Sequence, residues 1–138
     1  MNQLLGHILQ IETEQSLKLL EIEALGSHFS SLIIEDPREL HPFQIGEQVQ
    51  LFFKETEISI AKGLSGQLSL RNQIPCIVKQ IEKGKILAKI VLDFQGTEIT
   101  SLITTRSANH LDLQLEDKVT GLIKTNELLI QRITLNKL

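Results

Sequence analysis

The sequence predicts an all-β chain of two tandem Greek-key barrels of the oligonucleotide/oligosaccharide-binding (OB) type, each with about five strands and one short helical turn. The first supporting observation is an internal repeat, in which Asn2-Gln3 returns 70 positions later as Asn72-Gln73. The second is that apolar and polar residues alternate over short runs bounded by turn residues. No segment keeps a 3.6-residue apolar period, so a helical protein is not expected.

The repeat keeps one register along the whole chain without a gap. Asn2 precedes Lys54 by the same 52 positions that separate Asn72 from Lys124. Further matches at this offset are Ile11-Glu12 with Ile81-Glu82, Ser31-Leu32-Ile33 with Ser101-Leu102-Ile103, and Gly26 with Gly96. We therefore predict a first domain at 1–63, a linker at 64–66 and a second domain at 67–138. Units of about 65 residues are small for independent folding, so we expect burial between the copies or between chains.

The first copy contains five strand-like runs. We expect strands at 7–12, 17–23, 29–34, 48–54 and 57–61. The alternation slips by one residue at Leu20, which predicts a β-bulge in the second strand. Asp36-Pro37-Arg38-Glu39 has an N-cap acid, a proline at the first helical position and a glutamate at the third, so a single helical turn is predicted there.

The second copy repeats this order. We expect strands at 76–82, 86–94, 98–104, 118–124 and 127–133, with residues 105–110 in the place of the helical turn. Lys62 to Gln67 is short and contains two glycines, which is typical of a tight connector.

Composition excludes several functional classes. A net charge of −3 argues against a protein that covers nucleic-acid phosphates. No apolar run is long enough for a membrane span, and the first residues do not form a secretory signal, so we expect a cytoplasmic protein. One cysteine and four scattered histidines provide no metal-cation site, and no nucleophile–base pair is evident. An enzyme with catalytic residues is therefore not expected.

Several segments resemble the molybdate-binding Mop, or TOBE, domain. In the second copy these are Ser69-Leu70-Arg71-Asn72-Gln73, Ile81-Glu82-Lys83-Gly84, residues 99–104 and Gly121-Leu122-Ile123-Lys124. The first copy is similar through Asn2-Gln3, Leu5-Gly6, Ile11-Glu12 and residues 51–57. The chain as a whole resembles the tandem di-Mop proteins called molbindins. This resemblance implies two Mop/TOBE domains, binding of molybdate or tungstate without an organic cofactor, and no nucleic-acid or membrane partner. It also implies a homo-oligomer, expected to be a trimer, in which six Mop units pack together and bind the anion at subunit interfaces.

The resemblance also implies a set of ligand-binding residues. Molybdate is a tetrahedral dianion with four acceptor oxygens, so its site needs converging N–H and O–H donors and positive charge. The expected site residues are Ser69, Arg71, Asn72, Thr104, Ser107, Lys124 and Thr125. By resemblance, the Ser69–Arg71 segment of one chain faces the Thr/Ser segment and the lysine of another.

The first copy departs from this pattern. Ile34, Pro37 and Glu55 replace Thr104, Ser107 and Thr125 at the 70-residue offset. Asn2 and Lys54 could form a weaker second class of site that binds the anion mainly through backbone amides. Alternatively, this copy is structural. We favour the structural role, because the first copy lacks the side chains for an equivalent site. Asn2 and Asn72 are themselves interpreted first as turn residues bonded to their own backbone, with a backbone contact to the ligand as the alternative.

The sequence is compatible with one primary functional hypothesis and two alternatives. Storage, buffering or delivery of molybdenum inside the cell is the primary hypothesis, and an oxyanion-sensing module that regulates a protein partner is the alternative. A small OB barrel could also bind single-stranded nucleic acid, but that requires exposed aromatic side chains in a basic groove. The chain has five phenylalanines and no Trp or Tyr, and at least one of Phe52 and Phe53 should be in the core.

Overall fold

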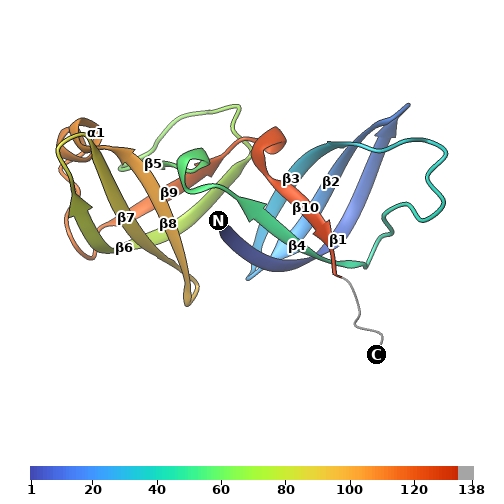
Figure 1. The fold of residues 1–138 in the computed structure, drawn as a ribbon, viewed down its shortest axis with the longest axis horizontal. Coiled ribbons are helices and arrows are strands. Elements are labelled where there is room, and N and C mark those ends of the chain that lie inside the picture. The colour runs from blue at the N-terminus through green and yellow to red at the C-terminus, as the bar shows by residue number, and fades with distance from the viewer. Residues whose placement is uncertain (134–138) are drawn as a thin grey trace.

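The computed structural model describes residues 1–133, which form two five-stranded antiparallel sheets placed end to end (Figure 1). Residues 134–138, at the end of the predicted second domain, lie outside the described part. The first half contains β1 (Asn2–Glu14), β2 (Leu17–Ala24), β3 (Ser27–Ile34), β4 (Gln48–Phe53), η1 (Glu55–Glu57) and β5 (Ser59–Ala61). The second half contains β6 (Asn72–Lys83), β7 (Leu87–Phe94), β8 (Thr97–Thr104), α1 (Thr105–His110), β9 (Lys118–Ile123), η2 (Thr125–Glu127) and β10 (Leu129–Arg132). Corresponding strands start 70 positions apart, as Asn2 and Asn72 do, which confirms the register of the repeat.

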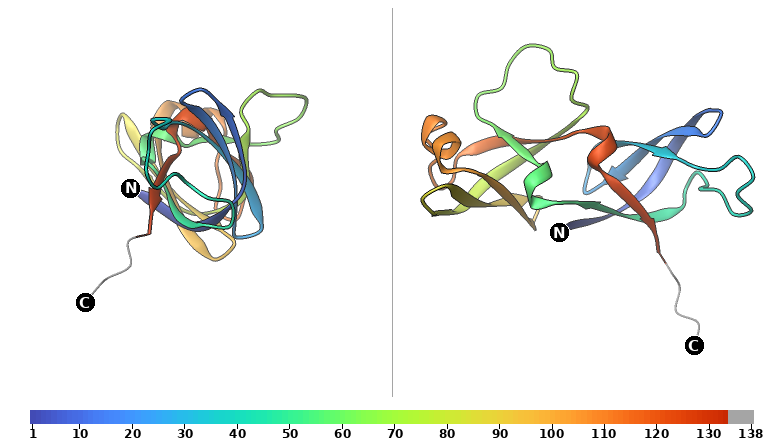
Figure 2. Two further views of the ribbon diagram at one scale, coloured as in Figure 1. Left: turned by 90° about the vertical axis from the view of Figure 1, so that its right-hand side faces the viewer. Right: turned by 45° about the horizontal axis from the view of Figure 1, so that its top comes forward.

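The last strand of each half belongs to the sheet of the other half. The strand orders are β10-β4-β1-β2-β3 and β5-β9-β6-β7-β8. Ser59 to Ala61 pair with Leu122 to Thr120, whereas Leu129 to Arg132 pair with Phe52 to Val49. The sequence places each of these strands at the end of its own copy, and that placement is wrong. The two halves are thus joined by two segments, one passing from each half to the other (Figures 1 and 2).

Serine hydroxyls hold the residue that precedes each exchanged strand. Ser31 Oγ donates to the Leu128 carbonyl and Ser101 Oγ donates to the Ile58 carbonyl, both at 2.7 Å. Both serines are fully buried, so these bonds satisfy groups that water does not reach. This confirms the interpretation of Ser31 and Ser101 as structural strand residues.

A cation anchors the far end of each exchanged strand. Arg132 Nε lies 2.6 Å from Glu47 Oε2, and its guanidinium lies 4.7 Å from the centre of the Phe43 ring. At the corresponding position Lys62 Nζ lies 3.0 Å from Asp117 Oδ2 and donates to the Asp112 carbonyl at 2.7 Å. Each half therefore binds the other half's last strand through an ion pair at its end.

One continuous core runs through both halves. Phe29 of β3 and Phe94 of β7 are fully buried and meet edge to face, with ring centroids 6.1 Å apart. Phe53 is also fully buried, which confirms the sequence expectation for that pair. Burying one such side chain contributes about 1.5–3 kcal/mol, so this contact between the halves stabilises their association.

Two local predictions are corrected. The bulge lies in β1, not in β2, since Ile8 pairs with Ile22 while Gln10 pairs with Glu21 and leaves Leu9 as the extra residue. Asp36–Glu39 forms a hydrogen-bonded turn, with Glu39 N–H donating to the Asp36 carbonyl at 2.9 Å, and no helix follows. The Asp36 side chain favours this turn over a helix, because its Oδ1 accepts the Arg38 N–H at 2.9 Å. In the second half the predicted helical segment is α1.

Within the described residues, no helix is long and apolar enough to cross a membrane. The same part of the chain contains no group of three or more His, Cys, Asp or Glu side chains that could hold a metal ion.

Candidate functional site

Four of the predicted ligand residues surround one small hollow on the surface of the second half. The start of β6 is preceded by Ser69 and Arg71, and β9 ends immediately before Lys124 and Thr125. Since β6 and β9 pair directly, with Asn72 opposite Ile123, these two segments emerge side by side. They line a depression of about 120 Å³ together with Leu70 and Asn126. The hollow brings two cations and two hydroxyls together within one chain.

The charges around this hollow are incompletely neutralised. Lys124 is exposed and has no ion-pair partner among residues 1–133. Arg71 has one acidic neighbour, with its guanidinium 3.8 Å from Glu21 Oε2, and its side chain remains 66% exposed. Glu21 lies on β2 in the other half of the chain and does not line the hollow. The arrangement is suited to a small anion that accepts hydrogen bonds.

Asn72 fixes the backbone next to Arg71 and is itself fully buried. Its Oδ1 accepts the Ser30 N–H at 2.7 Å, and its Nδ2 donates to the Ser30 carbonyl at 3.0 Å. The interpretation that Asn72 bonds its own backbone is wrong, because its partner is in β3 of the other half. A structural role of its side chain is confirmed, and a backbone contact to a ligand stays a prediction.

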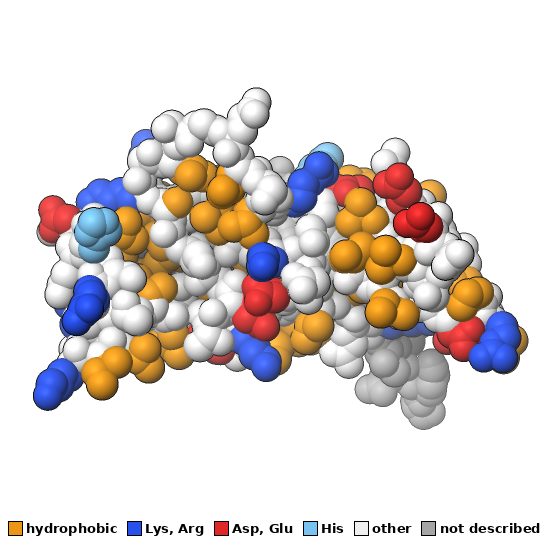
Figure 3. Space-filling model, turned by 90° about the horizontal axis from the view of Figure 1, so that it is seen from above, with side chains coloured by type: hydrophobic (Ala, Val, Ile, Leu, Met, Phe, Trp, Pro, Cys, Tyr) orange, Lys and Arg blue, Asp and Glu red, His pale blue; other side chains and the backbone are white. Residues whose placement is uncertain are grey.

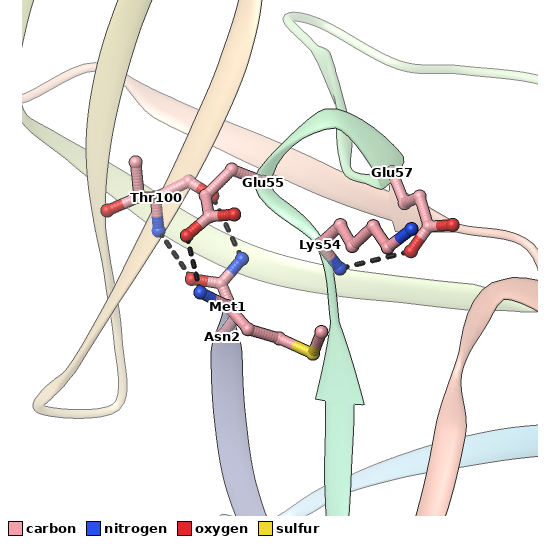
Figure 4. A network of polar contacts seen from close by, with 6 residues as sticks. All are labelled: Met1, Asn2, Lys54, Glu55, Glu57 and Thr100. Atoms are coloured by element: carbon pink, nitrogen blue, oxygen red, sulfur yellow. Dashed lines mark hydrogen bonds and ion pairs between the residues drawn. The ribbon is translucent and has the colours of Figure 1, made fainter.

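Asn2 forms the equivalent clamp. Its side chain donates to the Thr100 carbonyl and accepts the Thr100 N–H, each at 2.9 Å (Figure 4). Thr100 stands 70 positions after Ser30, so the two clamps are equivalent by the internal repeat. The repeated asparagine therefore marks contacts between the halves.

Thr104 and Ser107 are not brought to this hollow. Thr104 is the N-cap of α1 and its Oγ1 accepts the Ser107 N–H at 3.0 Å, while the two hydroxyl oxygens lie 2.9 Å apart. Ser107 lines a different depression with Ser59 of β5 and His110. Within one chain, the predicted ligand set thus divides into two groups.

The corresponding region of the first half carries carboxylates (Figure 4). Glu57 Oε1 accepts the backbone N–H of Lys54 at 3.0 Å, and Glu55 Oε2 lies 2.7 Å from the amino group of Met1. The hydrogen bond from that amino group holds the pKa of Glu55 below its ordinary value, so this carboxylate is ionised at neutral pH. Glu55 therefore places a negative charge at the position that Thr125 occupies in the second half.

Sequence reasoning missed the residues that support the hollow from the other half. Ser30 Oγ donates to Glu21, with both carboxylate oxygens at 2.9 Å, so Ser30 links Glu21 to Asn72. The available signal was a break in the repeat, since Glu21 corresponds to Val91. Nothing local to Glu21 indicates that its neighbour is Arg71.

A scan of family models matches residues 68–130 to the TOBE domain. This match lies wholly within the second half of the chain. This match spans the hollow at Ser69–Arg71 and Lys124–Asn126, and it confirms the resemblance on which the site was predicted.

The fold of the whole chain matches a solved tandem protein. The cytoplasmic molybdate-binding protein ModG, solved with molybdate bound, superposes with a TM-score of 0.89 at 24% identity and covers 96% of both chains. The predicted fold class of an all-β chain with two tandem OB-like barrels is therefore confirmed.

Two further similarities involve shorter matches. The molybdenum import ATP-binding protein ModC of Brucella abortus is 30% identical over 112 residues, which is 80% of this chain but 29% of the relative. The chain thus spans less than a third of the length of that relative. A molybdate-binding protein from Sporomusa ovata is 47% identical over 43% of this chain and 88% of its own, with a TM-score of 0.42.

Proposed function

We propose that this chain binds molybdate, and also tungstate, for storage, buffering or delivery of molybdenum inside the cell. The observation that carries the proposal is the hollow lined by Ser69, Arg71, Lys124 and Thr125. It lies in the TOBE domain of a fold shared with ModG, which was solved with molybdate bound. The proposed activity is binding without catalysis.

The chemistry of the hollow fits a tetrahedral oxyanion. Hydroxyl groups donate from Ser69 and Thr125, the Arg71 guanidinium offers a planar pair of donors, and Lys124 adds a mobile positive charge. Molybdate has only acceptor oxygens, so each of these donors can form a charge-assisted hydrogen bond with it. A neutral ligand would form weaker hydrogen bonds with the same donors.

A second chain completes the site in this proposal. The hollow is open to solvent, and the hydroxyls of Thr104 and Ser107 lie elsewhere on the same chain. We therefore assign them to the site of a neighbouring copy, in a homo-oligomer of three chains whose units are the tandem domains 1–63 and 67–138. Support comes from large apolar side chains left exposed on both halves (Figure 3), including Leu17, Ile34 and Leu87.

The two halves are unequal in this function. The second half supplies hydroxyls beside Lys124, whereas the first supplies the Glu55 carboxylate beside Lys54. A carboxylate repels a dianion and also competes for its donors. We assign the tighter class of site to the second half and a structural role to the first.

Calorimetric titration with molybdate, tungstate and sulfate tests the proposal, using Lys124→Ala and its repeat partner Lys54→Ala as a matched pair. We expect Lys124→Ala to abolish the tighter binding and Lys54→Ala to have a smaller effect. At a hundredfold excess over Kd, the anion should stabilise the unchanged protein by about 2.7 kcal/mol per site. Equal losses from the two substitutions would contradict the assignment to the second half, and no heat from any oxyanion would refute the function.

A further inference from the structure

The pair of Arg71 and Glu21 distinguishes the two halves of the chain. At the 70-residue offset, Arg71 corresponds to Met1 and Glu21 corresponds to Val91. Both equivalent side chains are therefore uncharged, and the amino group that Met1 carries instead pairs with Glu55 of its own half. The surrounding Asn–backbone clamp occurs in both halves. The carboxylate is present only where the candidate anion site has its arginine.

The structure fixes Glu21 more firmly than Arg71. The Glu21 side chain is 22% exposed and accepts the Ser30 hydroxyl, whose own backbone is clamped by buried Asn72. The Arg71 side chain is 66% exposed, and its 3.8 Å separation from Glu21 is longer than a hydrogen bond. A fixed acid thus attracts a guanidinium that remains free to turn.

Arg71 also lines the hollow, whereas Glu21 lines a neighbouring depression with Gln10 and Leu19. The guanidinium therefore lies between two alternative negative partners, the carboxylate of the first half and an anion in the hollow. An anion that binds the Arg71 guanidinium must replace Glu21 as its partner. The Glu21 carboxylate also repels an anion bound nearby.

We propose that Glu21 competes with the bound oxyanion for Arg71 and thereby lowers the affinity of the site, which favours release. This inference rests on the proposed function, because it concerns the same hollow. Glu21 acts through Arg71 and does not itself contact the anion. Since exposed ion pairs are worth little, removing the competition should tighten binding by about two- to fivefold.

The test is a double-substitution cycle measured by molybdate calorimetry at low salt. Glu21→Gln keeps the shape of the side chain and a hydrogen-bond acceptor for Ser30 but removes the charge. We expect it to bind molybdate about two- to fivefold more tightly than the unchanged protein. In an Arg71→Met background, which copies the residue of the first half, Glu21→Gln should change Kd much less. The gain should also shrink at high salt, because screening weakens exposed charge pairs.

Three outcomes would overturn the inference. Glu21→Gln could bind with unchanged or weaker affinity, it could show the same gain in the Arg71→Met background, or its gain could be indifferent to salt. Thermal unfolding of each variant without anion identifies any general loss of structure. Failure of the unchanged protein to bind molybdate, tungstate or sulfate would refute the proposed function and this inference together. Binding by the unchanged protein with no effect of Glu21→Gln would refute the inference alone.

Discussion

At the scale of single residues, the buried polar side chains explain how the two halves recognise each other. Asn72 satisfies both backbone groups of Ser30, and Asn2 does the same for Thr100. An asparagine amide is the right size and polarity for this role because it presents one donor and one acceptor, which match the N–H and C=O of one residue.

Asn72→Ala should destabilise the protein because it leaves the Ser30 N–H and carbonyl unpaired in a buried place. We expect a loss of about 2–4 kcal/mol in the free energy of unfolding, measured by chemical denaturation. Asn2→Ala should cost less, since Asn2 is 7% exposed and Asn72 is 0% exposed. The exposed Asn126→Ala serves as the control, and an equally small effect from Asn72→Ala would show that the clamp contributes little.

Cys76 should be inert in the folded protein. Its side chain is buried in β6, and burial raises the pKa of the thiol to about 12. The thiolate that reacts with disulfide reagents is therefore scarce at pH 8. Ellman's reagent should detect no thiol in the native protein and one per chain after unfolding in guanidinium chloride. Fast reaction of the native protein would contradict this burial.

At the scale of elements, the exchanged strands depend on contacts at both ends. β5 and β10 are short, so their few ladder bonds are supplemented by the serine bonds before them and the cations after them. The Lys62–Asp117 and Arg132–Glu47 pairs occupy corresponding positions although neither residue type is repeated. The two exchanged strands thus share an ion pair at their C-terminal ends, formed by different residue types.

The contacts of Asp117 with the Gln114 N–H and the Lys62 ammonium should make stability depend on acid pH. The Gln114 N–H and the Lys62 ammonium hold the pKa of Asp117 below its ordinary value of 3.8. Because the folded pKa is the lower one, the stabilisation is present above 3.8 and is lost as pH falls through the folded value. Asp117→Asn should therefore lower the unfolding midpoint at pH 7, and its difference from the unchanged protein should narrow below pH 3.8.

Denaturant unfolding at a series of pH values checks this behaviour, with exposed Glu98→Gln as a control for the loss of one negative charge. A difference between Asp117→Asn and the unchanged protein that stays constant with pH would show that ionisation of Asp117 is not the cause.

At the scale of the whole molecule, the outer surface is unequal between the halves. On the first sheet Leu17 pairs with Ile34 and Leu19 with Leu32, which forms an apolar strip across β2 and β3. In the second sheet the corresponding pairs are Leu87 with Thr104 and Lys89 with Leu102. The first half therefore contributes more apolar surface to the proposed assembly, while the second contributes the proposed anion site.

We expect Ile34→Lys to weaken the proposed oligomer without unfolding the chain. Ile34 is 81% exposed, so its replacement costs little within one chain but places an unpaired charge in an apolar contact. Light scattering coupled to size-exclusion chromatography should show three chains for the unchanged protein and a lower mass for the variant. Leu40→Lys, at a position that is 86% exposed in a loop, is the control. A monomeric unchanged protein would contradict the assembly.

Much of the fold follows from local pattern. Alternation, turn residues and the 70-residue repeat predict the strands and the place of α1. The resemblance implies that Lys124 faces Ser69–Arg71 from another chain, whereas the pairing of β6 with β9 brings these residues together within one chain. The bulge prediction for β2 is wrong because Leu17 and Leu19 lie on its outer face while Leu20 and Ile22 lie in the core. The slip in alternation at Leu20 thus reflects apolar residues on both faces of a strand that pairs regularly with β3. The Asp36 turn was misjudged because its capping residues also suit a non-helical turn.

The sequence by itself determined how many strands there are, their order along the chain and the donors available for an anion. Only the tertiary structure decided which sheet each final strand joins and which residues of one half support the other. The physical reason is that a strand of three or four residues carries the same alternation whichever edge it pairs with. Its choice is made by distant groups, the serine hydroxyls, the buried asparagines and the terminal ion pairs, whose contacts form only after both halves have come together.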